Sequence, residues 1–168
     1  VEGDRPTITC TDPEGRVTTV VADVVVGTDG SQGISRRAIP ASSRRDFFVE
    51  YPYAWFGILC EAPPSAKELI YTHSDHGFAL ISQRNASIQR MYFQCAPEED
   101  PRGWSEDRIW AELQRRVAGP DGLELNEGPV LDASVLRFRS VVCEPLRHGR
   151  LFLAGDAAHL NNPLGGMG

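Results

Sequence analysis

Two kinds of hydrophobic pattern divide the chain. Toward both ends, apolar runs finish in small residues: one begins at Val20 and ends at Gly27, and another covers Phe152–Ala154. Such runs are typical of strands in a parallel sheet, and we expect the first to be well buried. A further strand is expected at Thr7–Cys10. A turn and a short helix ended by Pro40 follow Gly27, which predicts the edge of a nucleotide-binding sheet.

The middle of the chain alternates apolar stretches with turns. Residues 41–53 are expected to form a polar linker and then the mixed stretch FFVEYPY. After them, the stretches ELIYTH, GFALISQ and IQRMYFQ are separated by SDH and RNAS. This spacing predicts an antiparallel sheet. The segment WSEDRIWAELQRRVAG predicts one amphipathic helix, capped by Ser105, whose apolar side chains share a face. These side chains are Ile109, Trp110, Leu113 and Val117.

The predicted fold is mixed, α+β and α/β. Partial Rossmann-like strips at residues 1–40 and 139–168 flank an antiparallel sheet domain at residues 41–138, which carries the one clear helix. A complete dinucleotide-binding domain needs a first strand, a glycine-rich phosphate turn and a crossover helix. The N-terminal part contains no GxGxxG. We therefore expect the chain to be an internal piece of a longer protein.

Composition and charge exclude several classes of function. The net charge of −6 argues against a general nucleic-acid binder, since these usually carry a basic surplus. No apolar run approaches the roughly 20 residues that span a bilayer. The four cysteines and four histidines lack metal-ligand spacing, so no metal is expected. Reduced thiols in a cytoplasmic protein are the expectation.

The string LAGDAAHLNNPLGGMG, from Leu153 to Gly168, is the strongest candidate for chemistry. Gly155 permits a tight turn after a strand, and Asp156 then presents a carboxylate that can accept hydrogen bonds from sugar hydroxyls. The glycines that follow Pro163 let the backbone lie flat against a ligand. The alternative is an ordinary turn in which the aspartate caps a helix.

This string resembles the second FAD-binding motif of the flavin-dependent aromatic hydroxylases. Asp29–Gly30, followed by Ser35 and Arg36, resembles the DGxxSxxR motif of the same family, although Asp-Gly alone is merely a good turn. The resemblance implies that Asp156 binds the flavin ribityl chain and that the loop after it lies along the isoalloxazine. The implied cofactor-binding residues are Asp29, Gly30, Arg36, Arg90, Arg139, Gly155, Asp156, Pro163, Gly165, Gly166 and Gly168.

The middle segment is similar to family members that hydroxylate 4-hydroxybenzoate. The resemblance implies that Ser82, Arg84 and Tyr92 hold the substrate carboxylate, that Pro163 contacts the substrate, and that Tyr71 acts at the phenol oxygen. Arginine offers a planar fork for a carboxylate, and a phenol can take up a proton. Shared strand parity is expected to point the clamp residues into one cavity. A solvated arginine beside half-buried tyrosines is the alternative.

The implied function is an FAD-dependent monooxygenase that uses NADPH or NADH and O2 to convert 4-hydroxybenzoate to 3,4-dihydroxybenzoate. Another phenolic acid as substrate, or a non-catalytic domain that kept the fold, stays open, as does a homodimer. Ser31 and Gln32 stand where the family has an aromatic residue and a histidine near the nicotinamide cofactor, and Met167 replaces a lysine near the flavin. We expect the 168-residue chain alone to be inactive.

Overall fold

The computed structural model describes residues 5–163. The chain divides into two compact units, each with its own core. Unit 1 combines the residues up to Glu50 with those from Arg139 on, and unit 2 covers Tyr51–Phe138. The strands β4 (Arg45–Glu61) and β8 (Val130–Glu144) contribute residues to both units. No helix among the described residues is long and apolar enough to cross a membrane.

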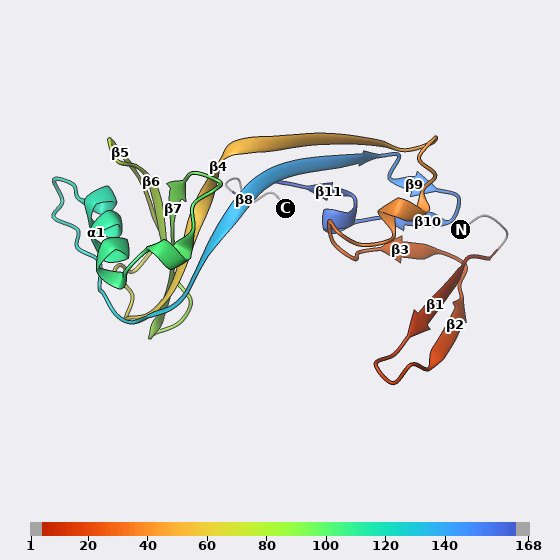
Figure 1. Ribbon diagram of the computed structural model, residues 1–168, viewed down its shortest axis with the longest axis horizontal. Coiled ribbons are helices and arrows are strands. Elements are labelled where there is room, and N and C mark those ends of the chain that lie inside the picture. The colour runs from red at the N-terminus through yellow and green to blue at the C-terminus, as the bar shows by residue number, and fades with distance from the viewer. Residues whose placement is uncertain (1–4, 164–168) are drawn as a thin grey trace. The chain divides into compact units, whose positions relative to one another are not determined.

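Unit 2 is built on an antiparallel sheet (Figure 1). The strands β5 (Ile70–Ser74), β6 (Gly77–Gln83) and β7 (Ile88–Cys95) coincide with the three apolar stretches, which confirms them as strands. In the sheet β7 lies between β4 and β6, and β5 is the edge strand. Because successive side chains of a strand point to opposite faces, this sheet presents two chemically different surfaces.

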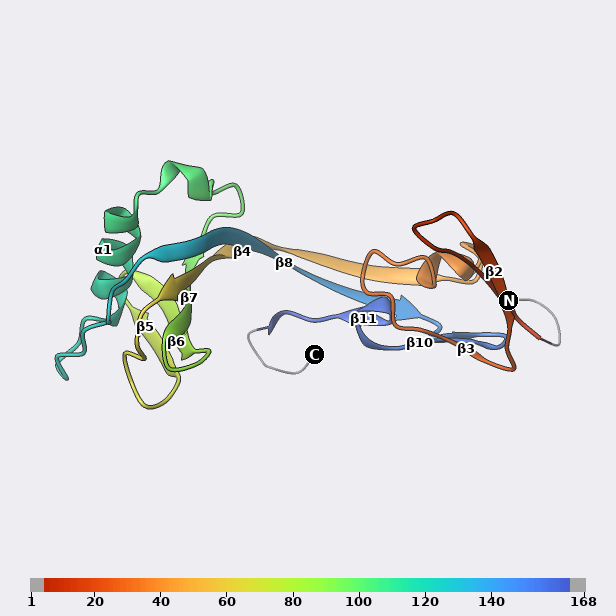
Figure 2. The same cartoon turned by 90° about the horizontal axis from the view of Figure 1, so that it is seen from below.

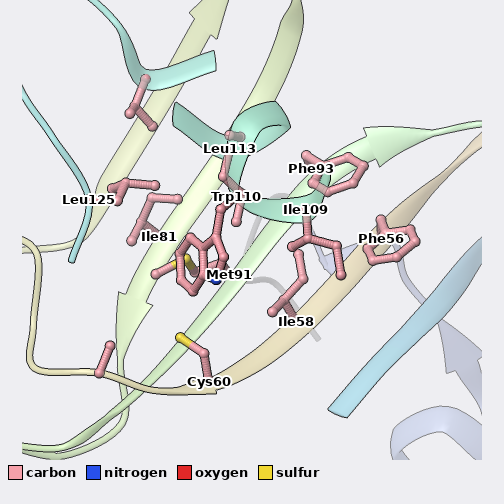
Figure 3. Packing of buried hydrophobic residues seen from close by; sticks show 13 residues of the cluster. Phe56, Ile58, Cys60, Ile81, Met91, Phe93, Ile109, Trp110, Leu113 and Leu125 are labelled. Carbon is pink, nitrogen blue, oxygen red and sulfur yellow. The ribbon is translucent and has the colours of Figure 1, made fainter. Parts of the chain in front are cut away.

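One face of the unit 2 sheet is covered by the helix α1 (Glu106–Val117), as predicted. A short 3-10 turn, η2 (Pro101–Gly103), precedes it, and the Ser105 hydroxyl caps it by accepting from the Arg108 N–H at 3.3 Å. Figure 3 shows helix side chains packed on strand side chains around Met91. The buried cluster is Phe56, Ile58, Cys60, Ala62, Ala79, Ile81, Met91, Phe93, Ile109, Trp110, Leu113, Val117 and Leu125.

Unit 1 contains a small parallel pair, in which β3 (Val25–Gly27) lies beside β10 (Leu151–Leu153) (Figure 2). The short strand β9 (Arg147–His148) pairs with β10 on its other side. The 3-10 turns η1 (Arg36–Ala38) and η3 (Gly155–Ala157) follow β3 and β10. Outside this sheet, β1 (Thr7–Thr11) and β2 (Val17–Val21) form a hairpin, and β11 (His159–Leu160) pairs with β8. The small core is Ile39, Cys143, Leu151, Leu153 and Ala158.

The mixed fold class is confirmed, but one local expectation is wrong. The run from Val20 to Gly27 is not one buried strand: it is the end of β2 and then β3, and Val21 and Val26 are more than half exposed. The polar linker that was expected before FFVEYPY ends where β4 begins, at Arg45, and FFVEYPY itself lies within β4. Runs of β-branched residues favour strands whether or not another layer covers them, so this pattern did not measure burial.

Candidate functional site

The two sequence motifs of unit 1 meet at one edge of its parallel pair. Gly27 lies opposite Leu153, and the Ala154 N–H donates to the Gly27 carbonyl at 2.9 Å. Asp29 follows β3 and Asp156 follows β10, so both come from the carboxyl ends of neighbouring parallel strands. Ligands of open α/β sheets bind in the crevice outside such strand ends.

Asp29 holds its own turn together. Its Oδ2 accepts a hydrogen bond from the Ser35 N–H at 2.8 Å. A Cβ on Gly33 would lie 2.1 Å from the Asp29 carboxyl carbon, so glycine is needed there. Burial acts to raise the pKa of Asp29, but hydrogen bonds led by the Ser35 N–H outweigh it and keep the pKa below its ordinary value. The carboxylate is therefore ionised at neutral pH and shapes the loop.

Asp156 is exposed, and its carboxylate accepts no hydrogen bond from residues 5–163. Gly155 has φ +58°, a left-handed conformation that favours glycine, and a Cβ there would meet open space. An exposed carboxylate beside an unobstructed backbone can accept hydrogen bonds from the hydroxyl groups of a ligand. Pro163 is exposed as the last described residue; the predicted Gly165, Gly166 and Gly168 lie outside the described range.

Arg36 and Arg139, far apart in sequence, line one small pocket of unit 1 with a volume of about 180 Å³. Gly30, with φ +75°, begins the turn that carries Ser31 and Gln32 into this pocket. The full lining is Ser31, Gln32, Arg36, Arg37, Asp46, Phe48, Arg139 and Val141. The structure therefore brings two of the predicted cofactor-binding arginines together, with Arg37 as a third that the sequence reasoning missed.

In unit 2, Tyr71, Ser82 and Tyr92 of the predicted substrate residues lie on the sheet face opposite α1. Cross-strand pairing places Tyr71 opposite Leu80, Leu80 opposite Tyr92, and Tyr92 opposite Gly57, which makes one row across four strands. Directly paired residues share a face. A second row on this face pairs Ser82 with Arg90, and the Ser82 hydroxyl donates to the Arg90 carbonyl at 2.8 Å.

Aromatic rings form the wall of this face. The Trp55 ring centroid lies 4.9 Å from that of Tyr92 and 5.4 Å from that of Phe78. Phe78 also lies 5.9 Å from Tyr71, so the rings run continuously to the edge strand. A Cβ at Gly57 would stand 3.2 Å from the Tyr92 ring, so glycine leaves room for that ring. Trp55 is only 4% exposed and Tyr71 is 56% exposed, so the edge-strand end of this row is the part open to solvent.

Two arginines border this face in different ways. The Arg90 guanidinium lies 5.4 Å from the Tyr92 ring centroid, and its Nε is buried without a partner in the described structure. Arg84 lies in the turn after β6, is exposed, and its backbone N–H donates to the Ile88 carbonyl at 2.8 Å. Strand parity therefore brings Ser82 and Tyr92 together but does not apply to Arg84, whose position depends on the turn.

Several residues of these sites escaped the sequence reasoning. Trp55 and Leu80 share strand parity with the predicted residues, so the antiparallel pattern contained the signal. The Arg36–Arg37 dipeptide was visible but gave no hint of a common pocket. For Asp46 no signal existed, because it lay in a segment interpreted as linker.

Metal binding would need grouped histidine, cysteine or acidic side chains within residues 5–163, and a reactive thiol would need a lowered pKa at a residue such as Cys95. No group of three or more His, Cys, Asp or Glu side chains there is placed to hold a metal ion. Burial, followed by the charge of Glu99, raises the pKa of Cys95 to about 11, although Arg116 opposes the shift. A thiol of this kind stays protonated at neutral pH and is a poor nucleophile.

A site at the carboxyl ends of parallel strands is typical of nucleotide-binding domains, and comparison with known proteins gives the family. Residues 2–168 match the family described as FAD binding domain, so the chain belongs to this family. Over 149 residues it is 40% identical to p-hydroxybenzoate hydroxylase of Acinetobacter baylyi. The aligned region covers 89% of this chain but only 37% of that protein. It is 29% identical over 158 residues to a 3-(3-hydroxy-phenyl)propionate/3-hydroxycinnamic acid hydroxylase of Burkholderia vietnamiensis, covering 92% of this chain and 24% of the relative.

Solved structures agree on the fold. A complex of aklavinone-11 hydroxylase with FAD and aklavinone superposes with a TM-score of 0.72 at 20% identity, covering 97% of this chain and 31% of that one. p-Nitrophenol 4-monooxygenase of Pseudomonas putida DLL-E4 gives a TM-score of 0.68 at 22% identity. The superposition covers 98% of this chain and 41% of that one. The chain thus has the fold of FAD-binding aromatic hydroxylases and spans less than half of these relatives.

Proposed function

We propose that this chain serves an FAD-dependent monooxygenase that converts 4-hydroxybenzoate to 3,4-dihydroxybenzoate with O2 and either NADPH or NADH. The observation that carries the proposal is the sheet face in unit 2, where Tyr71, Ser82 and Tyr92 share one surface walled by aromatic rings. The identity of 40% to p-hydroxybenzoate hydroxylase supports the choice of substrate.

In this proposal the polar groups of unit 2 orient the substrate. Ser82 turns its hydroxyl proton from the Arg90 carbonyl toward the substrate carboxylate, the Tyr92 hydroxyl donates a second hydrogen bond, and Arg84 supplies a charged fork. The substrate ring lies against the row of aromatic side chains. Binding both ends of a flat ring in one orientation sets which ring carbon faces the oxidant.

Tyr71 acts at the other end of the substrate. Its hydroxyl accepts the proton of the substrate phenol and passes its own proton on, which favours the phenolate. A phenolate is more electron-rich at the ortho carbon than a phenol is. Bound FAD, once reduced, supplies the redox chemistry that activates O2. Tyr71 lies on the edge strand β5 and is 56% exposed, which gives the relayed proton a path to water.

Unit 1 is proposed to hold the cofactors. Asp156 would accept from the ribityl hydroxyls of FAD, with Gly155 and Pro163 beside it, while Asp29 and Gly30 maintain the neighbouring turn. Arg36 and Arg139 would bind the reducing nucleotide. Inactivity of the 168-residue chain alone, a homodimer and a cytoplasmic location stay predictions.

The test uses the full-length, FAD-loaded protein that contains this chain. Arg84→Ala is expected to weaken 4-hydroxybenzoate binding by about 2–4 kcal/mol, measured by isothermal titration, because it removes one partner of a charged pair. The matched control is Arg137→Ala, an exposed arginine of the same unit that donates to the Pro97 carbonyl. Unchanged affinity in Arg84→Ala would contradict the clamp.

Tyr71→Phe separates catalysis from binding. We expect nearly intact 4-hydroxybenzoate affinity and a slower hydroxylation step, because the change removes a proton path and keeps the ring. Equal losses of binding and turnover would show that Tyr71 only lines the substrate site and does not act in proton transfer. The alternatives have their own readouts: a different phenolic acid would bind more tightly than 4-hydroxybenzoate, and a non-catalytic domain would show no flavin absorbance after purification.

A further inference from the structure

Arg116 is the one charged residue that is buried in the described part of the chain, and no step of the proposed reaction uses it. It lies in the last turn of α1, and both its Nε and its Nη2 lie 2.7 Å from Glu112 Oε1. Its guanidinium carbon lies 4.9 Å from the Phe93 ring centroid. Burying a charge is costly unless it is paired and hydrogen-bonded, so the remaining partners of this guanidinium indicate what it does.

The other hydrogen bonds of Arg116 connect α1 to the sheet. Arg116 Nη1 donates to the Phe78 carbonyl of β6 at 2.8 Å. The Arg116 carbonyl accepts from the Thr72 hydroxyl of the edge strand β5 at 3.2 Å. Carbonyls in the last turn of a helix have no partner within the helix, so Thr72 satisfies one of them. A single residue of α1 therefore binds both strands of the β5–β6 hairpin.

The turn of this hairpin leaves room for the arginine. Gly77 has φ +98°, a conformation that favours glycine, and a Cβ there would lie 3.2 Å from Arg116 Nη1. The pairs between β6 and β7 begin at Ala79, so Phe78 lies just beyond that ladder. Arg116 thus holds the hairpin at the end where its pairing with the rest of the sheet stops.

The backbone that Arg116 holds carries the proposed substrate face on its other side. Thr72 pairs with Ala79, which belongs to the core cluster beneath α1. Tyr71 and Phe78 precede these two residues, so their side chains point to the opposite face. There the rings of Tyr71 and Phe78 lie 5.9 Å apart, and Phe78 stacks on Trp55. A shift of the hairpin relative to α1 would therefore move Tyr71 along the aromatic row.

We propose that the Glu112–Arg116 ion pair anchors the β5–β6 hairpin and that Arg116 is a positioning residue, which holds Tyr71 where proton transfer from the substrate phenol requires it. The inference rests on the proposed function, in which Tyr71 relays that proton. Glu112 binds the Nε and Nη2 side of the planar guanidinium, which directs Nη1 toward the hairpin. The edge strand β5 is paired on one side only, so this attachment from the helix supplies a second constraint.

The experiment measures hydroxylation of 4-hydroxybenzoate in a single turnover of the full-length, FAD-loaded protein. Arg116→Lys keeps a charge beside Glu112 but loses the planar fork that binds the carboxylate and the Phe78 carbonyl together. We expect the hydroxylation rate constant to fall about tenfold, while affinity for 4-hydroxybenzoate stays within about twofold, because a displaced proton acceptor slows the chemical step more than it weakens binding.

Arg115→Lys is the matched control for this substitution. Arg115 is the neighbouring residue of α1, is half exposed, and donates to the same Glu112 carboxylate. Within residues 5–163 it makes no hydrogen bond to β5 or β6, so its substitution should leave the hydroxylation rate constant unchanged. A tenfold loss in this control as well, or a normal rate constant in Arg116→Lys, would overturn the proposal.

A double-mutant cycle with Tyr71 separates positioning from a general structural role. If Arg116 acts through the Tyr71 hydroxyl, Arg116→Lys should change the hydroxylation rate constant by less than about twofold in a Tyr71→Phe background, because that proton path is already lost. A structural role alone would lower the rate constant by the same factor in both backgrounds, and that result would reject positioning.

Thr72→Val provides a second variant where circular dichroism shows that Arg116→Lys is unfolded. It removes the hydroxyl that binds the Arg116 carbonyl and keeps a β-branched side chain that suits a strand. The loss of one hydrogen bond should lower the hydroxylation rate constant about twofold to threefold, again with little change in 4-hydroxybenzoate affinity. A rate constant equal to that of the wild-type protein would count against the anchor.

Hydrogen exchange separates this inference from the proposed function. The backbone amides of residues 70–83 should exchange about fivefold faster in Arg116→Lys than in Arg115→Lys, because exchange reports local opening of the hairpin. If no hydroxylated product forms but this difference is found, the anchor is supported and the assigned reaction is lost. If hydroxylation proceeds and neither its rate constant nor the exchange differs between the two variants, the reaction is retained and the anchor is rejected.

Discussion

Unit 2 and unit 1 differ in how completely they bury their strands. In unit 2 one helix covers a continuous antiparallel sheet, and Phe56 and Leu113 are fully buried. In unit 1 a two-strand parallel pair is packed on one side, while Val26 is 56% and Ile34 is 77% exposed. Parallel strands usually have both faces covered, whereas antiparallel sheets tolerate one open face. Unit 2 therefore has the core of an independent domain, and unit 1 has apolar surface that calls for further covering.

The two candidate sites differ in the same way. The unit 2 face is set by strand register, so Tyr71, Leu80 and Tyr92 are fixed by the backbone ladder. The unit 1 site combines the connection after β3 with Arg139 of β8, and its arginines donate hydrogen bonds to the Ser31–Gln32 turn of that connection. Sites on regular elements are more rigid than sites on loops. We expect perturbations of unit 2 to change stability and those of unit 1 to change mainly ligand binding.

The largest expected effect is a cavity in the unit 2 core. Phe93 is 1% exposed and stacks on Phe56 with ring centroids 4.8 Å apart. Phe93→Ala should lower the free energy of unfolding by about 3–5 kcal/mol. All three tryptophans lie in unit 2, so urea unfolding followed by tryptophan fluorescence reports this unit. In the same assay Val26→Ala in unit 1 should change stability by less than about 0.5 kcal/mol. A similar cost for both variants would remove the distinction between the units.

A smaller effect is expected from the buried amide of Gln89, which is 1% exposed. Its Oε1 accepts from the Ser65 N–H at 3.0 Å and the Ser65 hydroxyl at 2.9 Å, and its Nε2 donates to the Asn126 carbonyl at 3.3 Å. Gln89→Leu leaves these groups unpaired and should cost about 1–3 kcal/mol in urea unfolding. Gln83→Leu, at an exposed position of β6, is the control. If the free energy of unfolding fell only in the control variant, the amide network would contribute nothing to stability.

The smallest effect concerns the acid stability of unit 2. Burial acts to raise the pKa of Glu112, but hydrogen bonds from Arg116 and Arg115 outweigh it and hold the pKa below its ordinary value of 4.5. A lowered folded-state pKa gives stability that is present above pH 4.5 and is lost as pH falls through the folded-state value. The drop in unfolding free energy between pH 6 and pH 3 should therefore be smaller in Glu112→Gln than in the exposed-site control Glu124→Gln. Equal drops in unfolding free energy in the two variants would show that other groups cause the acid sensitivity.

Local signals in the sequence predicted much of unit 2 and little of the packing of unit 1. The periodicity of Ile109, Trp110, Leu113 and Val117 gave the helix and its buried face, because helix geometry alone puts these positions on one side. Strand parity gave the shared face of Ser82 and Tyr92. The exposure of the β1–β2 hairpin was not predictable in this way, since it depends on which layers lie above a strand.

By itself, the sequence determined the family, through the strings around Asp29 and Asp156, and the order of strands and helix in the middle of the chain. Only the tertiary structure decided that Arg36, Arg37 and Arg139 share one pocket and donate hydrogen bonds to the same turn, Ser31–Gln32. Residue type and spacing report on neighbours within a turn or a hairpin, up to about ten positions apart. Contacts between Arg139 and Ser31 join distant segments, because Arg139 lies on β8 and Ser31 lies in the turn after β3.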